Sequence, residues 1–526
     1  MRQPVVPSTV PTDRAREHRD EAPAVVTVRW DRYPVRLRRS LWFLAGLSPE
    51  WRDAFLYGCS ALFAGVTAVA MSIPLYRQWG QLAVGPYAVA TVFMAVVAWR
   101  FGLRPPADPE SSERRRTRSR RRWNWARVLA FLMVLFGATL VPLALEVVWR
   151  SEGNAALHVQ PEVVVVEQAG ARAAQGKNPY RVIDQNGHIL IHAKDEPLYE
   201  LYYPYLPGMV IFGFSSVSNV SSLDKAETPL TDARIQFLVF TIVVAVVALS
   251  RLRPPGDARG RSWQALTVLP TAALPLATGG DDMPVVALML LGLVAIQRRR
   301  PVLAGLVLGA ASSLKFTAWP LVFFALWAMW DRKAHRAVGR FALGVVAVVG
   351  PVVLPFALRN PTAFVDNVVR FPLGLAGVSS PAASALPGHI LVSAVPGSHR
   401  IYVVVVGIIG IAVLARCLIR KPPRDAAELA SFTGWVMLIA ILLAPATRVG
   451  YLLYPINLFL WAWMFRRSDD PVDAAPLASS RGEGGATPST GEPAHGQLSS
   501  GCSNTSTENG VVPAEVVGET TTPTSQ

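Results

Sequence analysis

Residues 304–324 read AGLVLGAASSLKFTAWPLVFF, a stretch in which Lys315 is the single charged residue. A helix needs about 20 apolar residues to cross a bilayer core of about 30 Å, and basic groups border this stretch on both sides. A lysine that faces lipid costs several kcal/mol. We therefore expect two short apolar helices, 302–314 and 316–330. Lys315 should face a cavity or a partner charge, or reach a nearby membrane interface.

The same apolar character extends over most of the chain. Hydrophobic residues make up 51% of the 526 residues and charged residues 17%, so most of the length cannot form a water-exposed surface. This composition predicts an all-α polytopic membrane protein. About twelve transmembrane helices are expected, at residues 53–74, 82–99, 127–148, 235–250, 263–278, 283–297, 302–314, 316–330, 338–358, 401–416, 427–445 and 449–465.

Clusters of basic residues predict the orientation in the membrane. The net charge of +15 comes from Arg- and Lys-rich groups beside apolar segments, including seven arginines within 114–122. This is the positive-inside pattern, and it argues against a nucleic-acid partner. With twelve crossings these groups share one side, so both termini are expected in the cytoplasm. If the short segment 205–219 were a thirteenth crossing, every later basic loop would lie on the other side of the membrane. We expect a re-entrant or interfacial helix there; the alternative is that it spans and a later short segment does not.

Composition divides the chain into four regions. Residues 1–51 are basic and lack the apolar core of a cleavable signal peptide, so a largely disordered cytoplasmic segment is expected. Residues 52–126 hold two extra transmembrane helices and an Arg-rich loop. Residues 127–467 hold the transmembrane core, with a large extracytoplasmic loop at 149–204. Residues 468–526 are rich in Gly, Pro, Ser and Thr, which predicts a disordered cytoplasmic tail.

A polar, aromatic-rich island interrupts the apolar segments at 162–208. It begins EVVVVEQAGARAAQGKNPY and ends YYPYLPG. On the topology above, the island shares the non-cytoplasmic face with GGDD at 279–282, Lys315, the loop 359–398 and PATRVGY at 445–451. Helix ends that bring distant residues to one membrane face are what a composite active site requires.

Each candidate also has a purely structural explanation. Loop carboxylates such as Glu162 are usually solvated, and several others compete with it. Asp281 and Asp282 can be explained as caps of the helix that begins at Met283, and Arg448 as an interfacial residue. The competing acids are Glu146, Glu152, Glu167, Asp184, Asp195, Glu196 and Glu200, and the tyrosines that fit an interfacial aromatic belt are Tyr202, Tyr203, Tyr205, Tyr451 and Tyr454.

The order of four pieces resembles glycosyltransferase family 87. These are Glu162, GKNPY at 176–180, YPYLP at 203–207, and an AG-x-x-x-G-x-x-x-x-x-K segment at 304–315. The resemblance covers roughly 125–465. It implies a polyprenol-phosphate-mannose-dependent mannosyltransferase with the multi-spanning GT-C architecture, active at the extracytoplasmic face of the cell membrane. The family typically has aspartate at the Glu162 position, so the carboxylate here reaches one methylene further.

The resemblance also implies roles for individual residues. Glu162, or its loop neighbour Glu167, would be the general base that takes the proton of the acceptor hydroxyl. Lys315 and Arg448 would meet the negative charge of the leaving polyprenyl phosphate. Further candidates for substrate contact are Asn178, Tyr180, Tyr203, Tyr205, Arg370 and His192.

Partners and cofactors follow from the same resemblance. The polyprenyl-phosphate sugar is the co-substrate, and the acceptor is a glycolipid, a cell-envelope polysaccharide or a protein, so no separate cofactor and no nucleotide-binding fold are expected. Metal-independent transfer is expected because Asp281 and Asp282 are adjacent, unlike a D-x-D site. Cys59, Cys417 and Cys502 lack metal-ligand spacing.

Two other classes of function compete with transfer. A transporter or flippase would use Lys315 and the acids to line a substrate path, although it would not need the long polar island. A catalytically inactive family relative or an assembly factor is favoured by glutamate at position 162 in place of aspartate.

Overall fold

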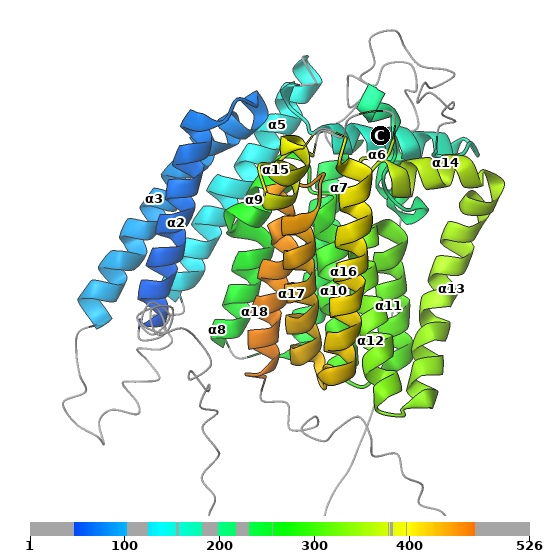
Figure 1. The fold of residues 1–526 in the computed structure, drawn as a ribbon. Coiled ribbons are helices and arrows are strands. Elements are labelled where there is room, and N and C mark those ends of the chain that lie inside the picture. Colours follow the sequence, from blue (N-terminus) through cyan, green and yellow to red (C-terminus); the bar gives the residue numbers. More distant parts are fainter. Residues whose placement is uncertain are drawn as a thin grey trace, which may run out of the picture. The chain divides into compact units, whose positions relative to one another are not determined.

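The protein is built from helices, as the sequence predicts. The computed structural model describes residues 47–102, 125–153, 157–180, 198–216, 231–254, 256–376, 378, 382–395 and 397–468. Within these ranges the sole β feature is an isolated bridge between Ala383 and Thr447. The helices lie side by side in a bundle, and α6 (Pro161–Ala174) lies at its upper end (Figure 1). The prediction of an all-α protein is confirmed for this part of the chain.

Seven of the described helices are long and apolar enough to cross a membrane. This confirms a multi-pass membrane protein, whereas the predicted twelve crossings are not confirmed. The seven are α2 (Pro49–Ala70), α3 (Pro74–Gly102), Trp125–Glu152, which contains η2 (Leu135–Leu140) and α5 (Val141–Glu152), α7 (Ala233–Leu252), α13 (His335–Arg359), α16 (His399–Arg420) and α17 (Ala426–Leu443).

The other predicted spans form shorter helices. Segment 263–278 is broken at Leu269, whose backbone is extended (φ −69°, ψ 150°) before Pro270. Proline cannot donate the backbone hydrogen bond that a continuous helix needs, so a new helix starts there. The shorter elements are α8 (Gly256–Trp263), η7 (Gln264–Val268), α9 (Pro270–Thr278), α10 (Asp282–Gln297), α11 (Pro301–Leu314), η8 (Phe316–Ala318), α12 (Trp319–Asp331) and α18 (Leu453–Phe465).

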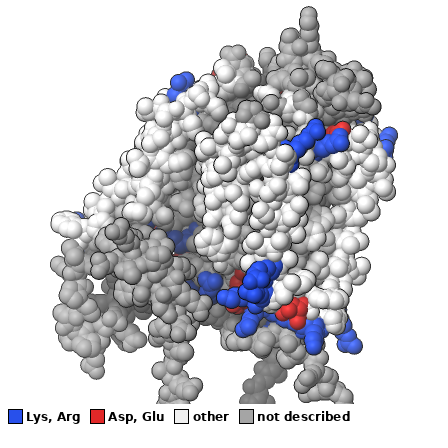
Figure 2. Space-filling model, viewed as in Figure 1, with Lys and Arg blue, Asp and Glu red and all other residues white. Residues whose placement is uncertain are grey.

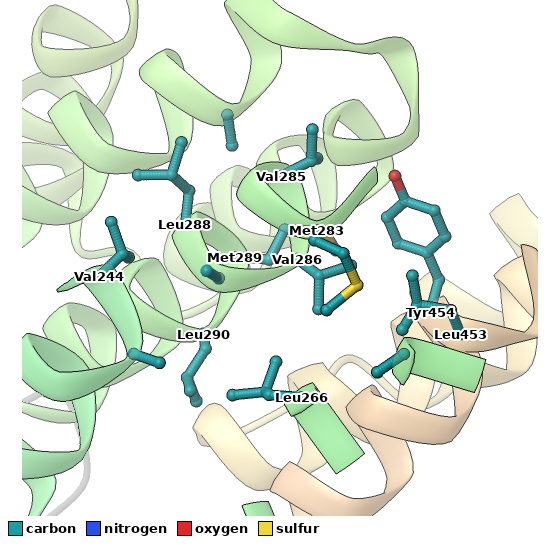
Figure 3. Close-up of a cluster of buried hydrophobic side chains, with 14 of the residues drawn as sticks. Val244, Leu266, Met283, Val285, Val286, Leu288, Met289, Leu290, Leu453 and Tyr454 are labelled. Atoms are coloured by element: carbon teal, nitrogen blue, oxygen red, sulfur yellow. The ribbon is translucent and has the colours of Figure 1, made fainter. Parts of the chain in front are cut away.

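The short helix α10 forms the centre of the hydrophobic core. Residues from Met283 to Ile296 are buried with one exception, Leu291, as expected for a helix that is apolar on all sides. Figure 3 shows its side chains between Val244 of α7 and Tyr454 of α18. Because α10 is enclosed by protein, its apolar surface stabilises the bundle rather than contacting lipid.

The periphery of the bundle has the opposite character. Helix α16 is as apolar as a membrane span, yet none of its residues is buried in the protein. Figure 2 shows an almost uncharged band on the viewed face, with the visible Lys and Arg side chains gathered toward the two ends of the helices. An outer surface of this kind fits the hydrocarbon core of a bilayer.

The first two helices are joined to the rest of the bundle by polar contacts. Trp79 of α3 donates a hydrogen bond to the Ala138 carbonyl (2.9 Å), and the Tyr87 hydroxyl donates to the Val268 carbonyl. At the other end of the pair, Asp53 of α2 forms ion pairs with Arg127 and Arg261. These contacts fix α2 and α3 against η2, η7 and α8.

Two short helices within residues 157–216 pack backbone to backbone. Helix α6 crosses η5 (Pro207–Ser216), a short 3₁₀ helix formed by most of the segment 205–219 that was expected to be re-entrant or interfacial. A Cβ atom added to Gly170 would lie 2.3 Å from the backbone of Gly213. Glycine at both positions therefore permits the close approach, and α6 is held flat on η5.

Candidate functional site

Glu162 lies in the first turn of α6 and forms an ion pair with Arg448. The helix begins with Pro161 at its first position, and an acid in the first turn is stabilised by the helix dipole. Glu162 Oε1 contacts Arg448 Nη1, with 19% and 24% of the two side chains exposed. Glu162 Oε2 is buried and has no hydrogen-bond partner among the described residues. One oxygen is thus held by a cation while the other is available to accept a proton.

Arg448 remains charged in this pair. It lies between α17 and η10 (Val449–Leu452), outside the spanning helices. Burial by itself would lower the pKa of its guanidinium, but Glu162 together with Tyr451, Tyr76 and Tyr205 outweighs burial, and the pKa is raised above its ordinary value.

Lys315 forms ion pairs with the carboxylates of Asp281 and Asp282. It follows α11 in an extended conformation (φ −151°, ψ 146°), and its Nζ lies 2.7 Å from Asp281 Oδ2 and 2.5 Å from Asp282 Oδ1. Tyr454 donates a hydrogen bond to the same Asp282 oxygen (2.6 Å). The expectation that Lys315 needs a partner charge agrees with this geometry, because a buried ammonium is stable only when it is paired.

Asp281 and Asp282 do lie at the N-terminus of α10, as the structural alternative expected, but without a side-chain cap. Helix α10 begins at Asp282, and Asp281 occupies the N-cap position without any side-chain capping hydrogen bond. Both carboxylates turn to Lys315 instead. A charge-assisted pair with an ammonium is stronger than a neutral cap.

Tyrosine rings connect the ion pair of Glu162 and Arg448 with the ion pairs of Lys315. A backbone hydrogen bond between Gln160 and Thr278 connects them as well. The Lys315 ammonium lies 5.2 Å from the centre of the Tyr205 ring and 5.3 Å from that of Tyr451. The charges of Glu162 and of Lys315 both act on the Tyr205 hydroxyl. We call the five residues Glu162, Arg448, Lys315, Asp281 and Asp282 the carboxylate–cation cluster.

The start of α6 is tied directly to the loop before Asp281. The Gln160 backbone N–H donates to the Thr278 carbonyl (3.0 Å), and its side-chain amide donates to Thr278 Oγ1 (2.7 Å). Gly279 lies against the Gln160 side chain, where a Cβ atom would be 2.2 Å from Oε1. The elements that carry Glu162 and Asp281 are therefore in contact. The structure brings together three residues that the sequence placed on one face: Glu162, Lys315 and Arg448.

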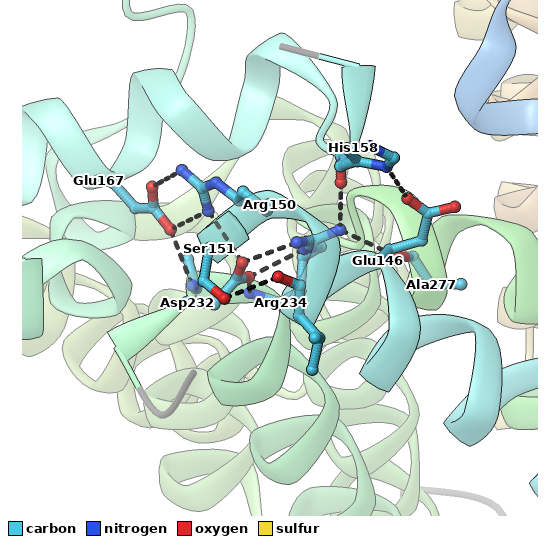
Figure 4. Close-up of polar contacts among 10 residues, drawn as sticks. Glu146, Arg150, Ser151, His158, Glu167, Asp232, Arg234 and Ala277 are labelled. Carbon is cyan, nitrogen blue, oxygen red and sulfur yellow. Dashed lines mark hydrogen bonds and ion pairs between the residues drawn. The ribbon is translucent and has the colours of Figure 1, made fainter. Parts of the chain in front are cut away.

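A second group of charges lies beside the cluster and is fully buried (Figure 4). Arg150 of α5 pairs with Glu167 of α6 (Nη2 to Oε2, 2.6 Å) and with Asp232 (Nη1 to Oδ2, 2.8 Å), and Asp232 also pairs with Arg234 (2.7 Å). Arg234 further donates to the His158 carbonyl (2.8 Å). We call Arg150, Glu167, Asp232 and Arg234 the buried network; it joins α5, α6 and the start of α7.

Glu167, the second candidate for general base, belongs to this buried network. Both of its oxygens accept hydrogen bonds from Arg150, and Oε1 also accepts from the Ala233 backbone N–H (3.0 Å). This leaves Glu162 as the acid of α6 with a free oxygen. Sequence reasoning missed Arg150, Asp232 and Arg234. The available signal was an arginine within an otherwise apolar span and an Asp-x-Arg sequence at a helix start.

The remaining candidates hold the external loop together. Asn178 Oδ1 accepts from the Tyr180 backbone N–H (3.0 Å), the Tyr180 hydroxyl donates to the Tyr205 carbonyl (2.9 Å), and Tyr203 is 2% exposed. Substrate contact by Asn178, Tyr180 and Tyr203 stays a prediction. Arg370 is exposed and pairs with Asp366. His192, Asp184, Asp195 and Glu196 lie outside the described residues.

No arrangement for a metal ion is seen in the described ranges. Among those residues, no three or more His, Cys, Asp or Glu side chains are grouped so that they could hold a metal. The ionisable groups of the carboxylate–cation cluster are instead paired with one another. What the cluster offers chemically is a proton acceptor beside two fixed cations.

Comparison with known proteins agrees with the resemblance seen in the sequence. Residues 226–445 match the model of glycosyltransferase family 87, which confirms that resemblance. The match includes Asp281, Asp282 and Lys315; it begins after Glu162 and the motifs at 176–180 and 203–207, and it ends before Arg448. No curated protein matches the chain. The crystal structure of ArnT from Cupriavidus metallidurans bound to undecaprenyl phosphate aligns over 66% of this chain and 60% of its own, at 14% identity and a TM-score of 0.39, a likeness too distant to carry an argument.

Proposed function

From the match of residues 226–445 to glycosyltransferase family 87, we propose that this membrane protein is a glycosyltransferase that uses a polyprenyl-phosphate-linked sugar. The sugar is a hexose, mannose by the family resemblance, and the acceptor is an extracytoplasmic glycolipid or cell-envelope polysaccharide. The observation that carries the proposal is Glu162, with one oxygen paired to Arg448 and the other buried and unpartnered among the described residues.

Glu162 acts as the general base in this proposal. The acceptor hydroxyl attacks the anomeric carbon of the donor sugar, the new C–O bond forms as the bond to the phosphate oxygen breaks, and Glu162 Oε2 takes the hydroxyl proton. A base of this kind must come within about 2.6–3.2 Å of the donor oxygen. The pair with Arg448 orients the free oxygen.

Lys315 and Arg448 stabilise the leaving phosphate. Negative charge moves onto the phosphate oxygens as the glycosidic bond breaks, and fixed cations near that position lower the barrier. Asp281 and Asp282 hold the Lys315 ammonium in place, and Tyr454 fixes Asp282. The donor is already activated by its phosphate, so neither a metal nor a further cofactor enters the proposed reaction.

The proposed active face is extracytoplasmic. Glu162, Lys315 and Arg448 all lie at the ends of helices opposite to those where basic residues gather. By the positive-inside rule the basic ends are cytoplasmic, which supports cytoplasmic positions for both termini. The basic residues at those opposite ends are Arg251, Arg253, Arg298, Arg299, Arg300, Arg420, Lys421, Arg466 and Arg467.

Replacing the proposed base tests the function. Membranes containing the parent, Glu162→Gln or Glu428→Gln are given radiolabelled polyprenyl-phosphate mannose and other lipid-linked sugars, and transfer is measured. Glu428 is an exposed acid at the start of α17 and serves as the matched control. We expect Glu162→Gln to reduce transfer by about 100-fold or more, while Glu428→Gln transfers at the parental rate.

The result is judged with folding measured alongside. Thermal unfolding in detergent should be alike for the three proteins. Parental transfer by a folded Glu162→Gln protein would show that Glu162 is not the base. Absence of transfer by the parent with every donor would contradict the glycosyltransferase function itself.

A further inference from the structure

An open cavity lies between the first helix pair and the external loop. Its volume is about 390 Å³, within the usual range for small-ligand sites. Gln78 near the start of α3, Trp149, Glu152 and Gly153 at the end of α5, and His158 in the following segment line it. Its walls therefore come from two transmembrane segments and the loop that leads into α6.

The lining has the chemistry of a site for a neutral sugar. The Trp149 and His158 rings are in contact (centroids 5.6 Å apart), which gives an aromatic wall. Gln78 Oε1 is buried and lacks a hydrogen-bond partner among the described residues, and the Glu152 carboxylate lies nearby. An aromatic face packs against sugar C–H groups, while an amide and a carboxylate accept hydrogen bonds from sugar hydroxyls.

The same lining does not suit a phosphate. Among the described residues, neither lysine nor arginine lines the cavity, and Glu152 would repel an anion. The His158 ring is turned to another acid, since its Nδ1 lies 2.8 Å from Glu146 Oε2. The cavity thus differs in chemistry from the carboxylate–cation cluster, which contains the cations Lys315 and Arg448.

Both elements that line the cavity also reach Glu162. On α3, Tyr76 precedes Gln78 by two positions, and the charges of Glu162, Arg448 and Asp281 act on its hydroxyl. In the loop, His158 precedes Glu162 by four positions. The two elements that supply Gln78 and His158 to the cavity therefore also lie close to Glu162.

We propose that this cavity binds the acceptor sugar. The inference rests on the proposed function: a sugar held by Gln78 and Trp149 presents a hydroxyl to Glu162, loses its proton there and bonds to the anomeric carbon as the phosphate leaves. Through Gln78 the first helix pair thereby acquires a role in choosing the acceptor.

Direct binding of simple sugars tests the subsite without any donor. Methyl glycosides of mannose, glucose, galactose and arabinose are added at millimolar concentration to the full chain in detergent, and saturation-transfer NMR measures binding. Gln78→Ala is compared with Gln81→Ala, which removes an exposed glutamine from the same helix. Trp149→Ala is compared with Trp149→Phe, which keeps an aromatic face.

We expect at least one glycoside to bind to the parent and to Gln81→Ala. Gln78→Ala should bind it about tenfold more weakly, as expected for the loss of a buried hydrogen bond. Trp149→Ala should lose binding and Trp149→Phe retain most of it. In transfer assays the KM for the acceptor should rise by a similar factor in Gln78→Ala, with the KM for the donor unchanged.

Two results would overturn the inference and a third separates it from the proposed function. Binding that is equal in the parent, Gln78→Ala and Trp149→Ala excludes the cavity as a sugar site, as does the absence of binding of every glycoside to the parent. A parent that binds a glycoside through Gln78 but transfers no donor sugar overturns the proposed function and, with it, the acceptor role.

Discussion

Two groups of charged residues lie at the same end of the bundle and differ in how completely they are paired. In the buried network, side chains are 0–7% exposed and every carboxylate oxygen has a partner. In the carboxylate–cation cluster, side chains are 8–24% exposed and Glu162 Oε2 has no partner among the described residues.

This difference separates a structural role from a chemical one. Buried charges are stable only when each is neutralised and hydrogen-bonded. Every carboxylate oxygen of the buried network meets that condition, and Arg150 Nε alone of its buried side-chain nitrogens and oxygens lacks a partner among the described residues. A group that reacts needs an oxygen that is not already hydrogen-bonded within the protein, and Glu162 Oε2 meets that need among the described residues. Under the proposed function, arginine and glutamate therefore serve packing in the buried network and reaction in the carboxylate–cation cluster.

The largest expected effect comes from breaking the buried network. Arg150→Met removes the guanidinium that neutralises Glu167 and Asp232. We expect a loss of about 3–5 kcal/mol in the free energy of unfolding, as for one partner removed from a buried pair. Thermal and denaturant unfolding in detergent measure it, with Arg359→Met, an exposed arginine at the end of α13, as the control. Equal stability of the two variants would contradict a structural role.

A smaller effect, and on activity, is expected in the carboxylate–cation cluster. Lys315→Met leaves Asp281 and Asp282 without their cation and removes a charge that faces the donor phosphate. We expect transfer to fall by about 100-fold, mainly through a higher KM for the donor. Lys315→Arg keeps the charge and should restore part of the rate. If Lys315→Met transfers normally, or unfolds as readily as Arg150→Met, the contrast between the two groups is wrong.

The smallest expected effect is a pH dependence of the buried network. Burial by itself would raise the pKa of Asp232, but Arg234 and Arg150 outweigh burial and lower the pKa to about 2. Because the folded pKa lies below the unfolded value, the stabilisation is complete above about pH 4 and is lost as pH falls toward 2, with a magnitude on the order of 2 kcal/mol.

Unfolding measured between pH 5 and 2 checks this dependence. The parent should lose stability more steeply than Asp232→Asn, which has no carboxylate to protonate at that position. Parallel curves for the two proteins would show that Asp232 does not titrate in this window.

Sequence reasoning located the cluster better than it described the membrane topology. A lone lysine in an apolar stretch, and an acid and an arginine at helix ends, are visible as chemical exceptions, and Lys315, Glu162 and Arg448 do meet. The partners of Lys315 were not identified, because a pairing between residues 34 and 33 positions apart depends on how two helices pack.

The number of crossings was not confirmed for a similar reason. Hydropathy marks apolar segments alike, whether they are enclosed, as α10 is, or face outward, as α16 does.

The backbone contact between α6 and η5 has a mechanical consequence. Gly170 and Gly213 leave no room for a side chain where α6 and η5 cross. These two segments therefore cannot slide past each other, and they form one rigid unit. Glu162 belongs to α6, and Tyr205, which faces Lys315, lies two residues before the start of η5. If this rigid unit tilts on the bundle to admit a long lipid, Glu162 and Tyr205 move together. The distance between the Glu162 carboxylate and the Tyr205 ring is then preserved.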